Sequence, residues 1–208
     1  IEVRKLGLYS RKSGFPSMSS VKRKSFYFDK AGVKNTGALL GFVKQYATEN
    51  RIKDIVVAST TGETGAKASR LFKRFNLVVV THHFGFPKSG GTELKEKYRQ
   101  EILANGAKLF TGTHSLSGPE RAIRKKFGTI EPLELIANTY RTLGEGTKVC
   151  VEITLMASDA GLIPVDRDVI AIAGTSSGAD TALVIRPANS SNFFDLKIKE
   201  IIAKPRNF

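Results

Sequence analysis

Short apolar runs alternate along this chain with longer segments whose apolar residues recur every three or four positions. The continuous runs are typical of buried strands and occupy residues 55–58, 77–80, 107–110, 169–173 and 182–185. The helical spacing occurs in residues 35–47, 68–75, 93–105 and 133–143. Alternating strands and helices predict a mostly parallel sheet between two layers of helices, the three-layer α/β/α class.

Three further segments refine this prediction. Residues 149–160 fit both the strand and the helix period, and the alternation of elements favours a helix. The runs at residues 169–173 and 182–185 are too close for a helical crossover, so they form a hairpin and the second runs antiparallel. Residues 25–28 predict one more short strand, whereas residues 197–204 fit either an edge strand or a packed cap.

The most informative segment is the turn at residues 59–65, Ser-Thr-Thr-Gly-Glu-Thr-Gly, between a predicted strand and a predicted helix. Such a turn directs free backbone N–H groups outward at the positive end of the helix dipole. Hydroxyl groups add donors, and glycine lets a ligand approach the main chain closely. We therefore predict a phosphate-binding loop here.

Three other loops follow predicted strands: residues 81–86, 111–117 and 174–181. The carboxyl ends of parallel strands share one edge of a sheet, so all four loops are expected at the same rim. His83 and His114 are candidates for ligand contact, and Phe86 for one wall of a pocket for a flat ring. Neighbouring His82 is expected to point to the opposite side of the chain, which disfavours a shared metal. We therefore predict no metal site.

Helix caps and carboxylates give further expectations. Ser117 and Glu120 have the spacing of a capping box before a helix. Glu152 is expected to form an ion pair rather than half of a catalytic carboxylate pair. Cys150, the only cysteine, is expected to be a small buried side chain rather than a nucleophile.

The length of 208 residues fits a single α/β domain, residues 1–208, in which residues 1–24 form a basic N-terminal extension. No apolar run is long enough to span a membrane. The first residues lack the apolar core of a signal peptide. They also lack a starting Met, so we expect that the true N-terminus was trimmed or precedes Ile1. The single cysteine fits a reducing cytoplasm, so we expect a cytoplasmic protein. The common nucleotide-binding fingerprints are absent.

A formal net charge of +14 calls for an explanation, either in a binding partner or in the surroundings of the protein. Nucleic acid is one alternative, because Lys and Arg release counterions from phosphates. The basic residues are spread along the chain, however, without an RNA- or DNA-binding motif, so nucleic acid is disfavoured as a partner. An anionic small-molecule ligand explains the charge equally well.

Several stretches carry a family resemblance. Residues 35–64 are similar to the C-terminal α/β domain of pyruvate kinase in the order helix, strand, Ser/Thr/Gly loop and helix. The closer resemblance is to stand-alone prokaryotic proteins built on that domain. It is carried by residues 81–86, 114–118, 148–154, 178–181, 185–188 and 205–207.

The resemblance implies a five-stranded mixed sheet whose last strand is antiparallel. In pyruvate kinase this domain binds a sugar-bisphosphate effector, with its phosphate in the loop that matches residues 60–64, and a second loop, here residues 174–180, closes over it. Some stand-alone relatives resemble flavin mononucleotide (FMN) binders. The chain is too short to add the roughly 250-residue catalytic barrel of pyruvate kinase, so that activity is rejected.

The leading hypothesis is therefore a cytoplasmic flavoprotein that holds FMN at the strand carboxyl-end rim. A flavin-dependent oxidoreductase, a regulatory module that senses a sugar phosphate or nucleotide, and a basic nucleic-acid-binding protein remain open alternatives. Whether the protein forms a homo-oligomer is left open. The predicted ligand-binding residues are Ser59, Thr60, Thr61, Gly62, Glu63, Thr64, Gly65, His83, Gly85, Phe86, His114, Ser117, Gly174, Thr175, Ser176, Gly178, Asp180 and Thr181.

Overall fold

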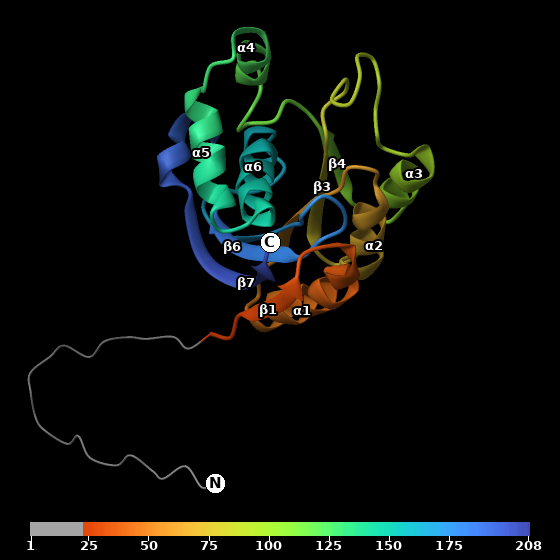
Figure 1. The fold of residues 1–208 in the computed structure, drawn as a ribbon. Helices are drawn as coiled ribbons and strands as arrows, with labels where there is room; N and C mark the ends of the chain where they lie inside the picture. Colours follow the sequence, from red (N-terminus) through yellow and green to blue (C-terminus); the bar gives the residue numbers. More distant parts are fainter. Residues whose placement is uncertain (1–22) are drawn as a thin grey trace, which may run out of the picture.

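A computed structural model describes residues 23–208, and the rest of the predicted N-terminal extension lies outside the described residues. Seven strands form one sheet in the order β1-β7-β6-β5-β2-β3-β4 (Figure 1). The strands are β1 (Phe26–Lys30), β2 (Asp54–Ala58), β3 (Asn76–Thr81), β4 (Lys108–Thr111), β5 (Val169–Ala173), β6 (Thr181–Arg186) and β7 (Lys197–Asn207). The α-helices are α1 (Thr36–Glu49), α2 (Glu63–Leu71), α3 (Glu96–Ala104), α4 (Glu120–Phe127), α5 (Pro132–Arg141) and α6 (Glu145–Asp159).

The strand directions confirm the mixed sheet but correct its size. β2, β3, β4 and β5 are parallel neighbours, and β6 pairs antiparallel with β5 as the hairpin argument predicted. The predicted five strands were wrong, because β7 pairs antiparallel with β6 and β1 pairs parallel with β7. β7 and β1 thus extend the sheet beyond β6, the strand that the resemblance implied to be its edge.

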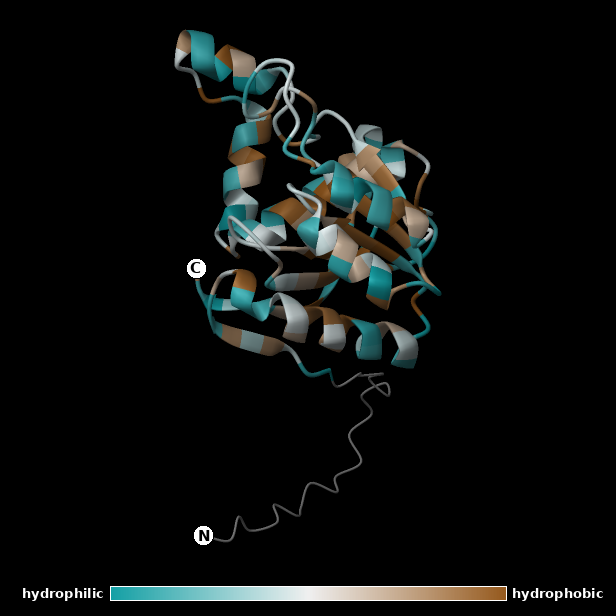
Figure 2. Ribbon diagram, turned by 90° about the vertical axis from the view of Figure 1, so that its right-hand side faces the viewer, coloured by the Kyte–Doolittle hydropathy of each residue, from teal (hydrophilic) through white to brown (hydrophobic). Residues whose placement is uncertain are grey.

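Two apolar layers hold the helices on the sheet, and they follow the period-two alternation of the strands. On one face, Ile55 and Val57 of β2 pack with Leu39 and Val43 of α1 and with residues of α2 and α3. On the other face, Val56 packs with residues of α5 and α6. Figure 2 shows this arrangement as apolar strands between helices whose outward faces are hydrophilic. The three-layer α/β/α prediction is therefore confirmed.

The ambiguous segment at residues 149–160 is helical and belongs to α6, most of whose residues are buried. This helix packs against β5 and β6 and contacts α5. A helix covered on several sides carries apolar residues around most of its circumference, which explains why its sequence also fits a strand period. Cys150 of α6 is fully buried, and burial raises the pKa of its thiol.

The capping box at Ser117 and Glu120 does not form. Helix α4 begins at Glu120, Pro119 occupies the N-cap position, and no side chain caps the helix. The Glu120 carboxylate instead accepts a hydrogen bond from the N–H of Leu133, at 2.9 Å. This bond joins α4 to the start of α5.

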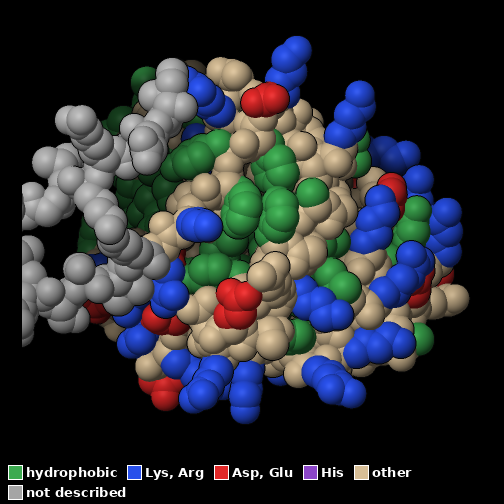
Figure 3. Space-filling view, turned by 90° about the horizontal axis from the view of Figure 1, so that it is seen from below, with side chains coloured by type: hydrophobic (Ala, Val, Ile, Leu, Met, Phe, Trp, Pro, Cys, Tyr) green, Lys and Arg blue, Asp and Glu red, His purple; other side chains and the backbone are tan. Residues whose placement is uncertain are grey.

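The edge formed by β1 is covered on one side by aromatic packing. Phe26 stacks on Phe42 of α1 with ring centres 4.3 Å apart, although Phe26 and Tyr27 remain partly exposed. Figure 3 shows apolar side chains gathered over α1 and β1 and surrounded by Lys and Arg side chains. Part of the basic surplus of this chain therefore lies on this outer face.

Candidate functional site

A cleft of about 1030 Å³ opens at the carboxyl ends of the parallel strands. It lies where the strand order reverses, because the chain continues from β2 to β3 on one side while β5 lies on the other side of β2. Open α/β sheets bind ligands at such a switch point. The loops after β2, β3, β4 and β5 all contribute to its lining.

Most of the predicted ligand-binding residues line this cleft. They are Ser59, Thr60, Thr61, Glu63, Thr64, Phe86, His114, Ser117, Gly174, Thr175, Ser176 and Gly178. Six others are not part of its lining, namely Gly62, Gly65, His83, Gly85, Asp180 and Thr181. The loops at residues 59–65 and 174–178 thus lie on one cleft, as the phosphate-binding hypothesis requires.

The turn before α2 leaves a row of backbone donors without protein partners. Among residues 23–208, no hydrogen bond occupies the N–H groups of residues 60–64, whereas Ser59 Oγ accepts the N–H of Gly65 at 2.9 Å. Unpaired N–H groups at a helix N-terminus together with the helix dipole favour an anion. Ser59 therefore closes the first turn of the helix, and residues 60–64 remain available to a ligand.

Gly62 and Gly65 serve packing rather than ligand approach. A Cβ at Gly62 would lie 2.6 Å from Tyr98 Cβ, so α3 approaches the turn too closely for any side chain. A Cβ at Gly65 would lie 2.6 Å from Val79 Cγ1 and 3.0 Å from Ile102 Cδ1. These glycines allow α2 to pack closely against its neighbours, which fixes the direction of the free N–H groups.

We expect Gly65→Ala to destabilise the ligand-free protein by about 1–3 kcal/mol, because the added methyl overpacks the contact with Val79. The matched control is Gly41→Ala in α1, where a Cβ meets nothing within 4 Å. That exposed substitution should stabilise the protein by about 0.5–1 kcal/mol. Urea unfolding of both variants measures the difference, and equal free energies of unfolding would show that Gly65 is not closely packed.

The loop at residues 174–180 is fixed at its base by Asp180 and Thr36. The buried Asp180 carboxylate accepts hydrogen bonds from the N–H groups of Gly32 and Thr175 and from the hydroxyl of Thr181. The hydroxyl oxygen of Thr36 accepts the N–H of Ala179 at 2.9 Å. Asp180 and Thr181 therefore shape the loop from behind the cleft.

Within this loop, Thr175 carries an unusual hydroxyl group. In residues 23–208, its Oγ1 is the one buried side-chain polar atom that lacks a hydrogen-bond partner. Thr175 also lines the cleft. A buried donor without a partner costs free energy, and a ligand oxygen would supply that partner.

Three histidines and Phe86 form one cluster beside the cleft. The rings of His82 and His83 lie 5.2 and 5.3 Å from the ring of His114, and Phe86 lies 4.1 Å from His82. The expectation that His82 and His83 point apart was wrong, because β3 ends at Thr81 and the strand alternation ends with it. His82 lines the cleft and its Nδ1 pairs with Glu93 Oε2 at 2.6 Å, whereas His83 lies outside the lining.

His114 is buried in this cluster. Burial, followed by the nearby positive charges of His82, Lys148, His83 and Arg121, lowers the pKa of His114 to about 3. The imidazole is therefore neutral at physiological pH and presents one donor and one acceptor nitrogen.

His114 should make folding stability depend on pH below neutrality. The unfolded chain binds a proton at this residue near pH 6.5 and the folded chain only near pH 3, so stability is lost as pH falls through that window. The loss is at most about 1.4 kcal/mol per pH unit. Urea unfolding between these limits should show a shallower pH dependence for His114→Asn than for the parent protein. Identical slopes would contradict the buried neutral imidazole.

The comparison with protein families agrees with this architecture. The family model described as "Pyruvate kinase, alpha/beta domain" matches residues 38–185, well over half of the chain. The chain belongs to this family. The matched part of the pyruvate kinase alpha/beta domain contains β2 to β6, so the two additional strands, β1 and β7, lie outside it.

Among solved structures, the chain is similar to Cryptosporidium parvum pyruvate kinase in complex with ADP. The identity is 16% and the TM-score is 0.36, and the similarity covers 74% of this chain. The same similarity covers 23% of that pyruvate kinase chain. The family assignment therefore rests on the match of residues 38–185.

The cleft of this pyruvate kinase alpha/beta domain is not basic, in contrast to the whole chain. Sequence reasoning predicted only Glu63 among its charged lining residues, and the structure adds ten more. They are Lys67, Glu93, Glu120, Arg121, Arg124, Glu134, Arg141, Glu145, Lys148 and Glu152. Apart from the histidines, the lining carries six carboxylate side chains and five Lys or Arg side chains. A phosphate would therefore depend on backbone donors rather than on a cationic wall.

Most of these charges neutralise one another. The ion pairs on the cleft are Lys67–Glu63, Arg124–Glu134, Arg141–Glu145, Lys148–Glu152 and His82–Glu93. The spacing of four residues in three of them was visible in the sequence, because positions i and i+4 are neighbours on a helix. Nothing in the local sequence indicated that these pairs line a cleft.

The Lys148–Glu152 pair is the most enclosed. Its Nζ and Oε2 atoms are 2.6 Å apart, and the two side chains are 7% and 5% exposed. The other carboxylate oxygen of Glu152 accepts the N–H of Leu116 at 3.2 Å. The pair thus joins α6 to the loop that carries His114, and the expected ion pairing of Glu152 is confirmed.

Residues 23–208 contain no group of three or more His, Cys, Asp or Glu side chains arranged to hold a metal ion. None of their helices is both long and apolar enough to cross a bilayer.

Proposed function

We propose that the cleft binds a phosphorylated small molecule, and that this ligand is FMN. The observation that carries the proposal is the row of free N–H groups at residues 60–64, in a turn that lines the same cleft as residues 174–178. A phosphate dianion would accept these donors and the positive end of the α2 dipole. Thr175 Oγ1 would supply a further donor from the opposite loop.

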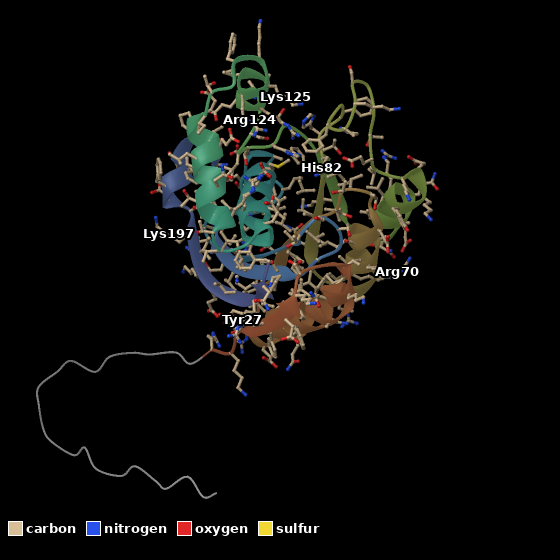
Figure 4. The ribbon with its side chains drawn as sticks, in the orientation of Figure 1. Tyr27, Arg70, His82, Arg124, Lys125 and Lys197 are labelled. Atoms are coloured by element: carbon tan, nitrogen blue, oxygen red, sulfur yellow. The ribbon has the colours of Figure 1, made fainter. Side chains whose placement is uncertain are left out.

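The ring system would lie toward His82, Phe86 and His114. Pockets for small molecules combine apolar and aromatic walls with a few placed polar groups, and volumes up to roughly 1,000 Å³ are common. The cleft has a comparable volume and contains this aromatic cluster beside the polar loops. Figure 4 shows His82 near the end of β3, and Phe86 and His114 line the same cleft.

Bound flavin would supply electron-transfer chemistry, and the protein would bind and orient it. The residues of the cleft support these tasks. The free N–H groups at residues 60–64 would anchor the phosphate, and the neutral His114 would offer a hydrogen bond to a ring heteroatom. The carboxylates of the cleft are engaged in ion pairs or, for Glu120, in a backbone hydrogen bond.

This engagement of the carboxylates favours a second candidate function, a regulatory module that binds a phosphorylated metabolite without catalysis. Catalytic acids and bases usually have access to a substrate proton, and a carboxylate held in an ion pair is poorly placed for that role. Family membership also agrees with metabolite binding. The two candidates share the phosphate site and differ in the rest of the ligand.

The test is a flavin titration of the purified protein, followed by flavin absorbance and fluorescence. The chain contains no Trp, so flavin fluorescence can be followed without Trp emission. We expect FMN to bind and riboflavin, which lacks the phosphate, to bind much more weakly. FMN at a hundredfold excess over Kd should raise the free energy of unfolding by about 2.7 kcal/mol. Absence of FMN binding together with stabilisation by a sugar phosphate would select the regulatory alternative.

A further inference from the structure

Arg121 differs from the other cationic side chains on the cleft. Within residues 23–208 it forms no ion pair and donates no side-chain hydrogen bond, whereas Lys67, Arg124, Arg141 and Lys148 each pair with a glutamate. Its guanidinium carbon instead lies 4.3 Å from the centre of the Phe86 ring. Arg121 is therefore the cation that a ligand can engage without breaking an existing ion pair.

The side chains around Arg121 form a stack of planar groups. Phe86, below the guanidinium, lies 4.1 Å from the His82 ring and 5.0 Å from the His114 ring, at interplanar angles of 36° and 39°. Arginine stacks on aromatic faces because its guanidinium is planar and delocalised. An aromatic ring that enters between Arg121 and Phe86 would meet a planar group on each side.

Helix α4, which carries Arg121, is weakly attached to the rest of the fold. None of its eight residues is buried, and Ile123 and Phe127 are 40% and 65% exposed. It is held to α5 by the Arg124–Glu134 ion pair and by the hydrogen bond from Leu133 to Glu120. In Figure 2 this helix projects from the body of the molecule. Its displacement by the thickness of one ring would therefore disturb few packed side chains.

The segment that contains α4 is bounded by Gly118 and Gly128, which have positive φ angles of 36° and 70°. Glycine tolerates such φ values without steric cost, so the chain can readjust on both sides of the helix. Figure 4 shows Arg124 and Lys125 on α4, above His82 in that view. Three residues of this helix, Glu120, Arg121 and Arg124, line the cleft.

We propose that Arg121 and Phe86 form a ring-binding subsite, in which a flat aromatic ring is held between the guanidinium and the phenyl ring while α4 covers it. This inference rests on the proposed function and narrows its ligand class to phosphorylated compounds with a planar ring, flavins and nucleotides, rather than sugar phosphates. Arg121 acts there through its planar face, because residues 60–64 already provide the phosphate donors.

The experiment compares three probes: FMN, riboflavin and ribose 5-phosphate, which has the phosphate but no ring. Each is titrated against the parent protein, Arg121→Ala and Arg121→Lys. Lys125→Ala is the matched control, because Lys125 is exposed on the same helix and does not line the cleft. Flavin fluorescence reports FMN and riboflavin, and calorimetry reports ribose 5-phosphate.

We expect Arg121→Ala to weaken the binding of FMN and of riboflavin by about tenfold and to leave the affinity for ribose 5-phosphate unchanged. Arg121→Lys should lose most of the same affinity, because it retains the charge but not the planar group. Full affinity in Arg121→Lys, equal weakening of ribose 5-phosphate, or unchanged FMN affinity in Arg121→Ala would each overturn the subsite.

The two proposals fail in different ways. If the parent protein binds ribose 5-phosphate but neither flavin, the ring subsite is wrong and the phosphate site remains. A second pattern is that riboflavin binds as tightly as FMN, that Arg121→Ala weakens riboflavin binding, and that ribose 5-phosphate does not bind. In that case the phosphate site is wrong and the ring subsite remains. If none of the three probes binds, both proposals are rejected.

Discussion

Thr60→Glu is expected to weaken FMN binding by at least about a hundredfold, because it places a carboxylate beside the free N–H groups of residues 60–64. Like charges brought together in a binding site cost several kcal/mol, and each 1.4 kcal/mol is a factor of ten in Kd. The introduced carboxylate would also occupy these donors itself. Fluorescence titration with FMN measures the effect, and riboflavin, without a phosphate, should be affected much less.

The matched control for this variant is Thr139→Glu. Thr139 is exposed on α5, does not line the cleft, and the substitution changes the net charge by the same amount. Its FMN affinity should equal that of the parent protein. An unchanged affinity in Thr60→Glu would show that the turn before α2 does not hold the phosphate.

Glu152→Ala is expected to destabilise the protein by about 3–5 kcal/mol, because it leaves the Lys148 ammonium buried without its counter-charge. The same change also removes the acceptor of the Leu116 N–H. Urea unfolding in the absence of ligand measures the loss. Because the pair lies on the cleft wall, FMN binding should weaken as the loop of His114 loosens.

The double variant Lys148→Met with Glu152→Leu is the control for this prediction. It removes both charges and keeps apolar volume, so the remaining cost should be about 1–3 kcal/mol, for the unpaired Leu116 N–H. A double variant that is as unstable as Glu152→Ala would show that the loss comes from packing rather than from an uncompensated charge.

Much of the fold could be predicted because its signals are local. The apolar run at residues 55–58 and the turn that follows it specify a strand, a turn and a helix within one short segment. The hairpin of β5 and β6 followed from the short connection between them. The edge strands β1 and β7 could not be fixed in the same way, since each is held by pairing with a strand distant in sequence.

The site was predicted in outline and corrected in detail. Ser, Thr and Gly in loops indicate ligand binding and tight packing equally. The sequence therefore could not show that Thr60 lines the cleft whereas Gly65 serves close packing. Asp180 resembled a ligand-binding residue, but its carboxylate is occupied by Gly32, Thr175 and Thr181. Arg121 carried no local signal, because its importance depends on Phe86 and on the ion pairs of its neighbours.

The sequence by itself determined the layered α/β architecture, the direction of β6 and the loop chemistry at the strand carboxyl ends. These features depend on residue periodicity, on connection length and on residue types that act within a few positions. The tertiary structure alone decided which backbone donors remain free, which charges are neutralised and which cation on the cleft stays unpaired. Those properties depend on partners that the fold brings together from distant segments, because hydrogen bonds, burial and ion pairing are set by neighbours in space.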